Sequence, residues 1–187
     1  MPSIPLTIYI TPFAEKGVTE AAKWSCDSAK DALDVVNGIW VKANVAFVIK
    51  DCIVDTPLDI AKDSRNDDKR LLGVLTYRHS EDQSIHIYLV NSIENLNAGG
   101  GSYQSSDPEP ASFVQWYYNT AANGRAWAHE LGHLMTLDHV KIDYTKEREA
   151  AALRGNLMVE GLSTGRDLSA RQIAQAKGSA LVKRFAG

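Results

Sequence analysis

The sequence has few cysteines, no long apolar run and little net charge. Its two cysteines, Cys26 and Cys52, are too few for a disulfide-stabilised scaffold, and their number decides neither their pairing nor the redox compartment. No run of about 18 apolar residues is present, so no membrane-spanning helix is expected. The net charge of −3 gives no electrostatic reason to expect nucleic acid or an acidic membrane as a partner.

The N-terminal residues 1–5 lack the charged and apolar segments of a signal peptide, and no inhibitory propeptide is visible. A signal peptide already removed, or a chain cut from a larger protein, would give the same pattern, so localisation stays open. The length suits one domain, and a hydrophobic content of 44% is enough for a substantial core.

Hydrophobic periodicity and turn residues divide the chain into alternating strands and helices. A capping box formed by Ser169 and Gln172 is expected to open the last helix. The expected elements, in chain order, are a strand at 6–10, a long helix from about 19 to 43, a buried strand at 46–54, a charged loop at 62–70, strands at 71–77 and 85–90, a loop at 97–110, a short strand at 112–118, a helix from near 123, and the last helix from 169.

Three of the five histidines lie within residues 129–139. His129 and His133 are four residues apart, so on a helix both side chains project from the same face. Two neutral imidazoles in that position can bind one Zn²⁺, and Glu130 can reach a water on the metal without ligating it. His139 would point about 120° away from His133 if the helix continued. It can join the other two only if the helix ends between them and the chain turns back.

Three histidine ligands with an open fourth position describe a catalytic zinc site, because a structural site closes that position. A chance occurrence of the short His-Glu-x-x-His pattern is the alternative, but three of five histidines in this register make chance a poor explanation. Each ligand histidine also needs an acceptor for its outer ring nitrogen, which the sequence does not name.

Residues 129–139, His-Glu-Leu-Gly-His-Leu-Met-Thr-Leu-Asp-His, resemble the metzincin signature HExxHxxGxxH. Residues 155–158, Gly-Asn-Leu-Met, resemble the methionine turn of the same clan, so Met158 is expected beneath the metal as an apolar floor. The order of elements is similar to that of the small metzincins, and most similar to the compact matrixin or snapalysin type. Specific motifs cover only residues 125–160, whereas the element order covers most of the chain.

The sequence departs from the metzincin pattern at two positions. Thr136 replaces the signature glycine, and because a β-branched residue strongly disfavours positive φ, we expect the turn to use other dihedrals or a neighbouring residue. Glu160 stands where some metzincins have tyrosine, so no tyrosine ligand or oxyanion helper is expected there.

The resemblance implies an α+β, zincin-like fold: a twisted mixed β-sheet with a long backing helix, an active-site helix, a methionine turn and a C-terminal helix. It implies one catalytic domain over residues 1–187, with an upper part at about 1–139, a lower part at about 140–187, and a cleft between them. Substrate would lie extended along an edge strand, which we expect within residues 85–104. The implied protein is a monomer acting on proteins or peptides, with secretion or export favoured and neither nucleic acid nor membrane as a partner.

The implied activity is that of a zinc-dependent endopeptidase. One Zn²⁺ held by His129, His133 and His139 would polarise the scissile carbonyl and lower the pKa of a bound water, and Glu130 would act as the general base. Three imidazoles would also bind copper, nickel or cobalt. A Ca²⁺ site in the loop at 97–107 is a further possibility, although its residues lack the EF-hand pattern.

Two other functions stay open. A bacterial endoribonuclease family that matures ribosomal RNA carries a similar three-histidine motif ending in Asp-His, but it has glycine at the positions of Glu130 and Thr136. A catalytically silent zinc-binding module is the second alternative, although such a module has no need of Glu130. Other residues that could join a site are Asp138 as an alternative ligand, Glu147 or Glu149 as a third ligand, Tyr144 beside the oxyanion, and His79 and His86 in a cleft wall.

Overall fold

The computed structural model describes residues 1–15, 18–59, 73–77, 79, 84–91, 100–103, 111–115, 119–143, 145–159 and 165–186. The charged loop expected at 62–70, most of the calcium loop at 97–107, Tyr144 and Glu160 lie outside these residues. Within the described residues, no helix has the length and apolar character needed to cross a membrane.

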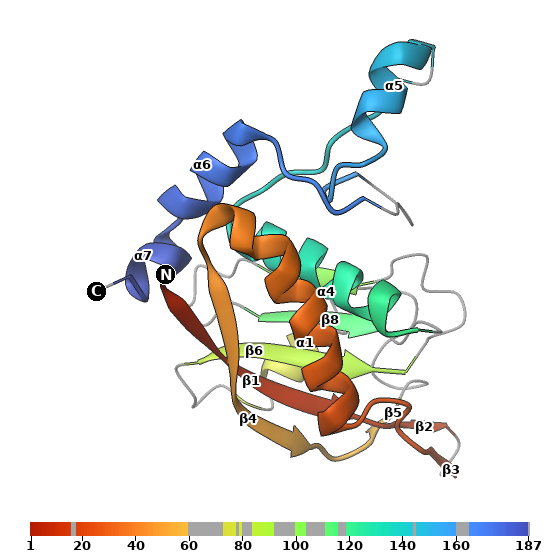
Figure 1. Ribbon diagram of the computed structural model, residues 1–187. Helices are drawn as coiled ribbons and strands as arrows, with labels where there is room; N and C mark the ends of the chain where they lie inside the picture. Colours follow the sequence, from red (N-terminus) through yellow and green to blue (C-terminus); the bar gives the residue numbers. More distant parts are fainter. Residues whose placement is uncertain are drawn as a thin grey trace.

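A twisted five-stranded sheet forms the centre of the molecule (Figure 1). Four of its strands are parallel, and β7 runs antiparallel to β8 and forms one edge. The strands, in spatial order, are β4 (Ala46–Val54), β1 (Ser3–Thr11), β6 (Ile85–Val90), β8 (Ala111–Gln115) and β7 (Gly100–Tyr103). A smaller three-stranded sheet pairs β3 (Val18–Glu20), β2 (Phe13–Glu15) and β5 (Leu58–Asp59).

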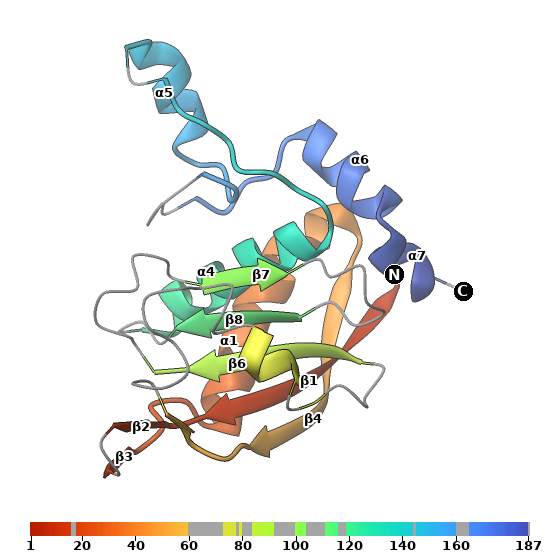
Figure 2. The same ribbon diagram turned by 180° about the vertical axis from the view of Figure 1, so that it is seen from behind.

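Two helices, α1 (Cys26–Trp40) and α4 (Thr120–Leu134), lie side by side on one face of the sheet, and Figure 2 shows the opposite face. Alternation along β1 sends Ile4, Leu6, Ile8 and Ile10 into the core beneath the helices, and sends Tyr9 into a second cluster on the other face. A 3₁₀ turn, η1 (Val41–Ala43), follows α1. The remaining helices are α5 (Glu147–Leu153), α6 (Ala170–Gly178) and α7 (Ala180–Arg184). In both views α5 stands away from the rest of the molecule.

Helices α1 and α4 approach each other closely. A Cβ at Gly124 would lie 2.5 Å from Val35 Cβ and 2.6 Å from the Ala32 carbonyl oxygen, so only glycine allows this approach. The indole nitrogen of Trp40 donates a hydrogen bond to the Ala128 carbonyl oxygen (3.2 Å) and ties the two helices together. The helix that carries the histidine motif is therefore held by close packing on α1.

Two helix predictions were wrong in detail. The long helix begins at Cys26 and not near residue 19, because residues 18–20 pair with β2 and Ser25 provides the N-cap, in a capping box with Ser28. Residues 73–77 are helical, although their sequence favoured a strand. They lie over the sheet face opposite α1 and α4, where Leu75 is buried against the second cluster (Figure 2).

Two strand predictions were also wrong. Residues 100–103, expected within a loop, form β7, because the exposed edge of β8 supplies backbone partners that Gly and Ser accept as readily as other residues. The strand at 46–54 is present with the expected bounds, but it is an edge strand and not a buried one. Val48, Ile53 and Val54 are 45%, 43% and 69% exposed.

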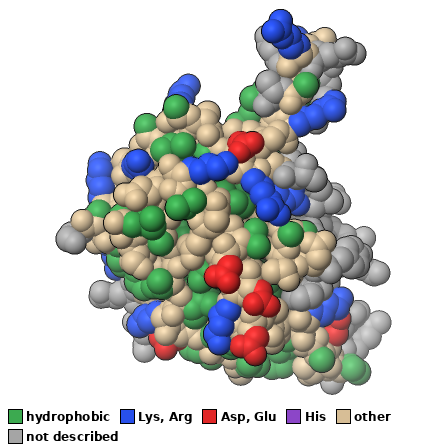
Figure 3. All heavy atoms as spheres, in the orientation of Figure 1, with side chains coloured by type: hydrophobic (Ala, Val, Ile, Leu, Met, Phe, Trp, Pro, Cys, Tyr) green, Lys and Arg blue, Asp and Glu red, His purple; other side chains and the backbone are tan. Residues whose placement is uncertain are grey.

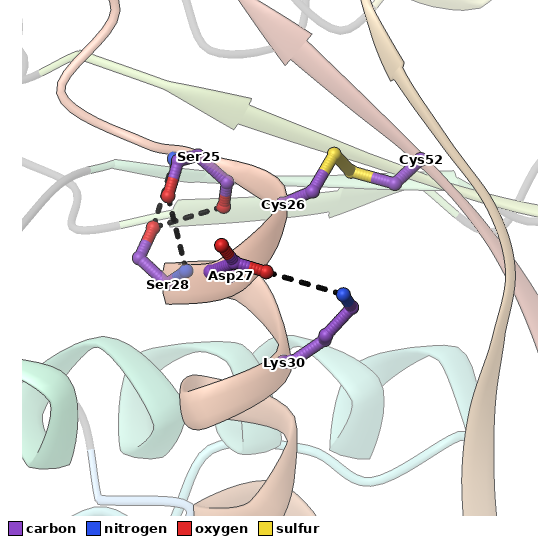
Figure 4. The surroundings of a disulfide bond; sticks show 6 residues. All are labelled: Ser25, Cys26, Asp27, Ser28, Lys30 and Cys52. Carbon is purple, nitrogen blue, oxygen red and sulfur yellow. Dashed lines mark hydrogen bonds and ion pairs between the residues drawn. A yellow bond between two sulfur atoms is a disulfide. The ribbon is translucent and has the colours of Figure 1, made fainter.

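A disulfide bond joins Cys26 at the start of α1 to Cys52 on β4 (Figure 4). The Cα atoms are 6.0 Å apart, and 26 residues separate the two cysteines in the sequence. Closing a loop of that length stabilises a fold by roughly 3–4 kcal/mol in the chain-entropy account. The bond fastens the outermost strand to the helix layer.

Charge is unevenly divided along the chain. Residues 140–187 contain nine Lys and Arg residues against five Asp and Glu residues, whereas residues 1–139 contain eleven against eighteen. On the face shown in Figure 3, most acidic side chains lie over the lower half, whereas basic side chains are spread over both halves and are frequent over the upper elements.

Candidate metal centre

The structure brings His129, His133 and His139 together at one point beside the C-terminal half of α4. Their three Nε2 atoms form a triangle in which every side is 3.1 Å. Three nitrogen ligands about 2.0–2.1 Å from one tetrahedral ion lie about 3.3–3.4 Å from one another. The triangle therefore has close to the size that one zinc ion requires.

Backbone carbonyl groups orient two of the rings. The Nδ1 atom of His129 lies 2.8 Å from the Leu157 carbonyl oxygen, and that of His133 lies 2.8 Å from the Leu137 carbonyl oxygen. A carbonyl oxygen only accepts, so each Nδ1 carries the proton and each neutral ring presents a lone pair at Nε2. Converging lone pairs 3.1 Å apart repel each other unless a cation lies between them, so the donor set fits a metal ion.

The electrostatics of the site favour the neutral imidazoles. Burial lowers the pKa of His129 to about 4; the hydrogen bond to Leu157 opposes this shift, and His133, His139 and Arg125 add to it. Burial also lowers the pKa of His133, with a smaller contribution from His139. Both rings are therefore neutral near pH 7, which is the form that ligates metals.

The turn after α4 is made by Thr136 itself, with φ 68°. The expectation that this β-branched residue would avoid positive φ was wrong. The amides of Thr136 and Leu137 donate to the carbonyl oxygens of His133 and Gly132, both at 2.9 Å, which is the Schellman pattern with the left-handed residue just past the helix. The Gln175 side chain also donates to the Thr136 carbonyl oxygen. These hydrogen bonds offset the strain of a left-handed threonine.

We expect Thr136→Gly to stabilise the protein by about 1 kcal/mol. Glycine removes the penalty of about 1–2 kcal/mol for a left-handed side chain, but it also loses more backbone entropy on folding, which cancels part of the gain. Urea unfolding of the zinc-free protein would measure the change. Thr136→Ala is the matched control, since it removes the β-branch but keeps Cβ, and it should gain less. A glycine variant that is no more stable than the parent would contradict the strain argument.

His139 is held in place by a second contact after the turn. The amide of Val140 donates to the Met158 carbonyl oxygen at 2.7 Å, and Val140 forms a parallel bridge with Val159. The same short segment supplies the Leu157 carbonyl group that orients His129. Residues 157–159 therefore fix two of the three histidines, one through its ring and one through its backbone.

Met158 lies directly against the motif helix and is fully buried. A Cβ at Gly132 would lie 2.5 Å from Met158 Sδ, so the glycine between His129 and His133 makes room for the methionine. The Asn156 side chain accepts from the Met158 amide at 2.9 Å and exchanges two hydrogen bonds with Gln172, at 2.8 and 3.1 Å. Gln172 also closes the capping box of α6 with Ser169, as the sequence predicted.

Glu130 is 6% exposed and lies on α4 next to the first histidine. Its carboxylate oxygen Oε2 is 2.6 Å from the hydroxyl of Ser102, which is also 2.9 Å from the Glu130 carbonyl oxygen. Ser102 belongs to the edge strand β7. Sequence analysis gave no role to Ser102, Asn156 or Gln175. Asn156 was noted only as part of the expected methionine turn, and Ser102, which belongs to no recognisable motif, is 28 residues away from Glu130 in the sequence.

The other sequence candidates do not join the site. Among the residues that the structure describes, the three histidines form the only group of three or more ligand side chains, and Asp138 is exposed. Glu147 and Glu149 are on α5, and their side chains are outside the described part. His79 and His86 lie on the opposite face of the sheet, where His79 stacks on Tyr9 at 3.8 Å and its Nε2 is 3.1 Å from Asp55.

Neither a scan against protein-family models nor a sequence comparison with curated proteins gives a match. By structure, the chain is similar to metalloproteinase-II from Bacteroides fragilis, with a TM-score of 0.57 and 13% sequence identity over 94% of this chain and 52% of that chain. It is also similar to a chain in the structure of a chaperone–substrate complex, with a TM-score of 0.49 and 14% identity over 75% of this chain and 24% of that one.

The likeness to the Bacteroides protein shows the fold of this chain, which is a zincin-like α+β fold. The chain spans about half the length of that protein. This fold and a three-histidine group that could hold a metal ion thus occur in the same chain.

Proposed function

We propose that this protein is a zinc-dependent endopeptidase of the metzincin clan, of the compact matrixin or snapalysin type. The observation that carries the proposal is the triangle of three Nε2 atoms, each 3.1 Å from the others, together with the buried Glu130, which directly follows His129 on α4. His129, His133 and His139 are the proposed ligands, and the open fourth position is left for substrate and water.

Zinc bound there would supply a Lewis acid that polarises a carbonyl group and lowers the pKa of a nearby water. Glu130 accepts a proton from the attacking water and delivers it to the nitrogen of the leaving amine. Two features support this role: Glu130 directly follows a proposed ligand, and its position is restrained by Ser102. Met158, packed against Gly132, belongs to the proposed methionine turn and would form an apolar floor beneath a bound metal.

The substrate we propose is an extended segment of a protein or peptide, bound in a cleft between residues 1–139 and 140–187 of a single, monomeric domain. The edge strand β7 lies within the range 85–104 expected for the substrate strand. Among the strands that the structure describes it pairs only with β8, so its outer side could add one more strand. A disulfide bond is characteristic of oxidising compartments, which supports secretion or export.

Mass-spectrometric profiling of a mixed peptide library tests the function. The zinc-loaded protein should cut peptides internally, a chelator should abolish the cuts, and added zinc should restore them. Ribosomal RNA incubated in parallel tests the ribonuclease alternative. RNA cleavage without peptide cleavage would replace the proposal with that alternative, and a folded, zinc-loaded protein that cuts neither would favour a silent zinc-binding module.

A further inference from the structure

We infer that Ser102 is a positioning residue for Glu130, and that its hydroxyl couples the orientation of the general base to the substrate-binding edge strand. This inference rests on the proposed function, because it assigns a role within the same site. Ser102 comes from β7, whereas Glu130 comes from α4, so the contact links two elements that backbone hydrogen bonds do not join.

The geometry indicates that the Ser102 hydroxyl donates its hydrogen bond to the Glu130 carboxylate and not to the Glu130 carbonyl oxygen. Ser102 Oγ lies 2.6 Å from Glu130 Oε2 and 2.9 Å from the Glu130 carbonyl oxygen, and one proton serves one strong hydrogen bond at a time. A hydrogen bond to a charged acceptor is shorter and stronger than one to a neutral acceptor, so the proton belongs on the Oε2 side. Oε2 is then held by the Ser102 hydroxyl.

A carboxylate on a helix has several rotamers, and a base works only within hydrogen-bond reach of the proton it removes. The Ser102 hydroxyl holds one of these rotamers. Substrate is also proposed to lie along β7. The Ser102 hydroxyl therefore fixes the Glu130 carboxylate relative to the strand that binds the substrate. Loss of the hydroxyl should therefore lower the rate of the chemical step without weakening substrate or metal binding.

Steady-state kinetics on a peptide cleaved by the wild-type protein, with zinc content measured on the same samples, test this inference. Ser102→Ala should lower kcat about 10- to 100-fold, the range expected for a hydrogen bond to a charged group, with KM and zinc content unchanged. Ser102→Thr keeps the hydroxyl and should stay within about threefold of wild type. Ser112→Ala is the matched control: Ser112 lies on β8 opposite Ser102 and is buried, and its hydroxyl has no hydrogen-bond partner in the described part of the chain.

A double-mutant cycle distinguishes positioning from general support of the fold. In a Glu130→Gln background, Ser102→Ala should lower kcat no further, because the base it positions is already gone. The two side chains should also show a coupling in the free energy of unfolding, measured without zinc and without any activity. An unchanged kcat in Ser102→Ala, or an equal loss of kcat in both backgrounds, would overturn the inference alone. A zinc-loaded wild-type protein that cleaves no peptide would overturn the proposed function and this inference together.

Discussion

Replacing Glu130 by glutamine will lower kcat for peptide cleavage by at least about 100-fold, the usual contribution of a positioned general base, and will leave zinc bound. Glutamine has nearly the size of glutamate and still offers an oxygen to the Ser102 hydroxyl, 2.6 Å from Oε2 in the parent protein. It cannot accept the proton of the attacking water. The three histidines and the carbonyl groups that orient them are untouched by the change.

The measurement is kcat and KM on one peptide substrate, with zinc content determined by atomic absorption on the same protein. Glu20→Gln is a matched control on β3, because the Glu20 side chain is 53% exposed and lies far along the chain from the motif. Near-normal turnover by Glu130→Gln would contradict the general-base role. A large loss accompanied by loss of zinc would show that Glu130 acts on the metal site and not on the proton.

The parts of the fold that follow from local sequence were predicted well. Strand β4 has the predicted bounds, and the capping box at Ser169 forms. Each of these depends on residues within a few positions of one another. The same holds for His129 and His133, whose shared face follows from their spacing on one helix.

The parts that depend on tertiary contacts were not predicted. The return of the chain that brings in His139 was expected, but the left-handed conformation of Thr136 that makes the turn was not, because propensity argues against that conformation. It is stabilised by the carbonyl groups of the helix end and by Gln175, which is 39 residues away in the sequence. Strand β7 forms from a Gly- and Ser-rich segment because β8 provides an edge, so the contact of Ser102 with Glu130 could not be anticipated either.

Replacing His139 by alanine will lower zinc affinity by more than about 100-fold. Removing only the group that hydrogen-bonds to a ligand histidine typically lowers metal affinity about 10–100-fold, and here the ligand itself is lost. Two imidazoles on one helix face remain, held by the Leu157 and Leu137 carbonyl groups. Zinc at a hundred times its dissociation constant should stabilise the parent protein against unfolding by about 2.7 kcal/mol. The same zinc concentration should no longer raise the unfolding midpoint of the alanine variant. Zinc titration and thermal unfolding, with and without zinc, measure both effects. His79→Ala is the matched control, because His79 pairs with Asp55 on the opposite face of the sheet and should leave zinc affinity unchanged. If His139→Ala binds zinc as tightly as the parent, His139 is not a ligand and another residue must be the third one.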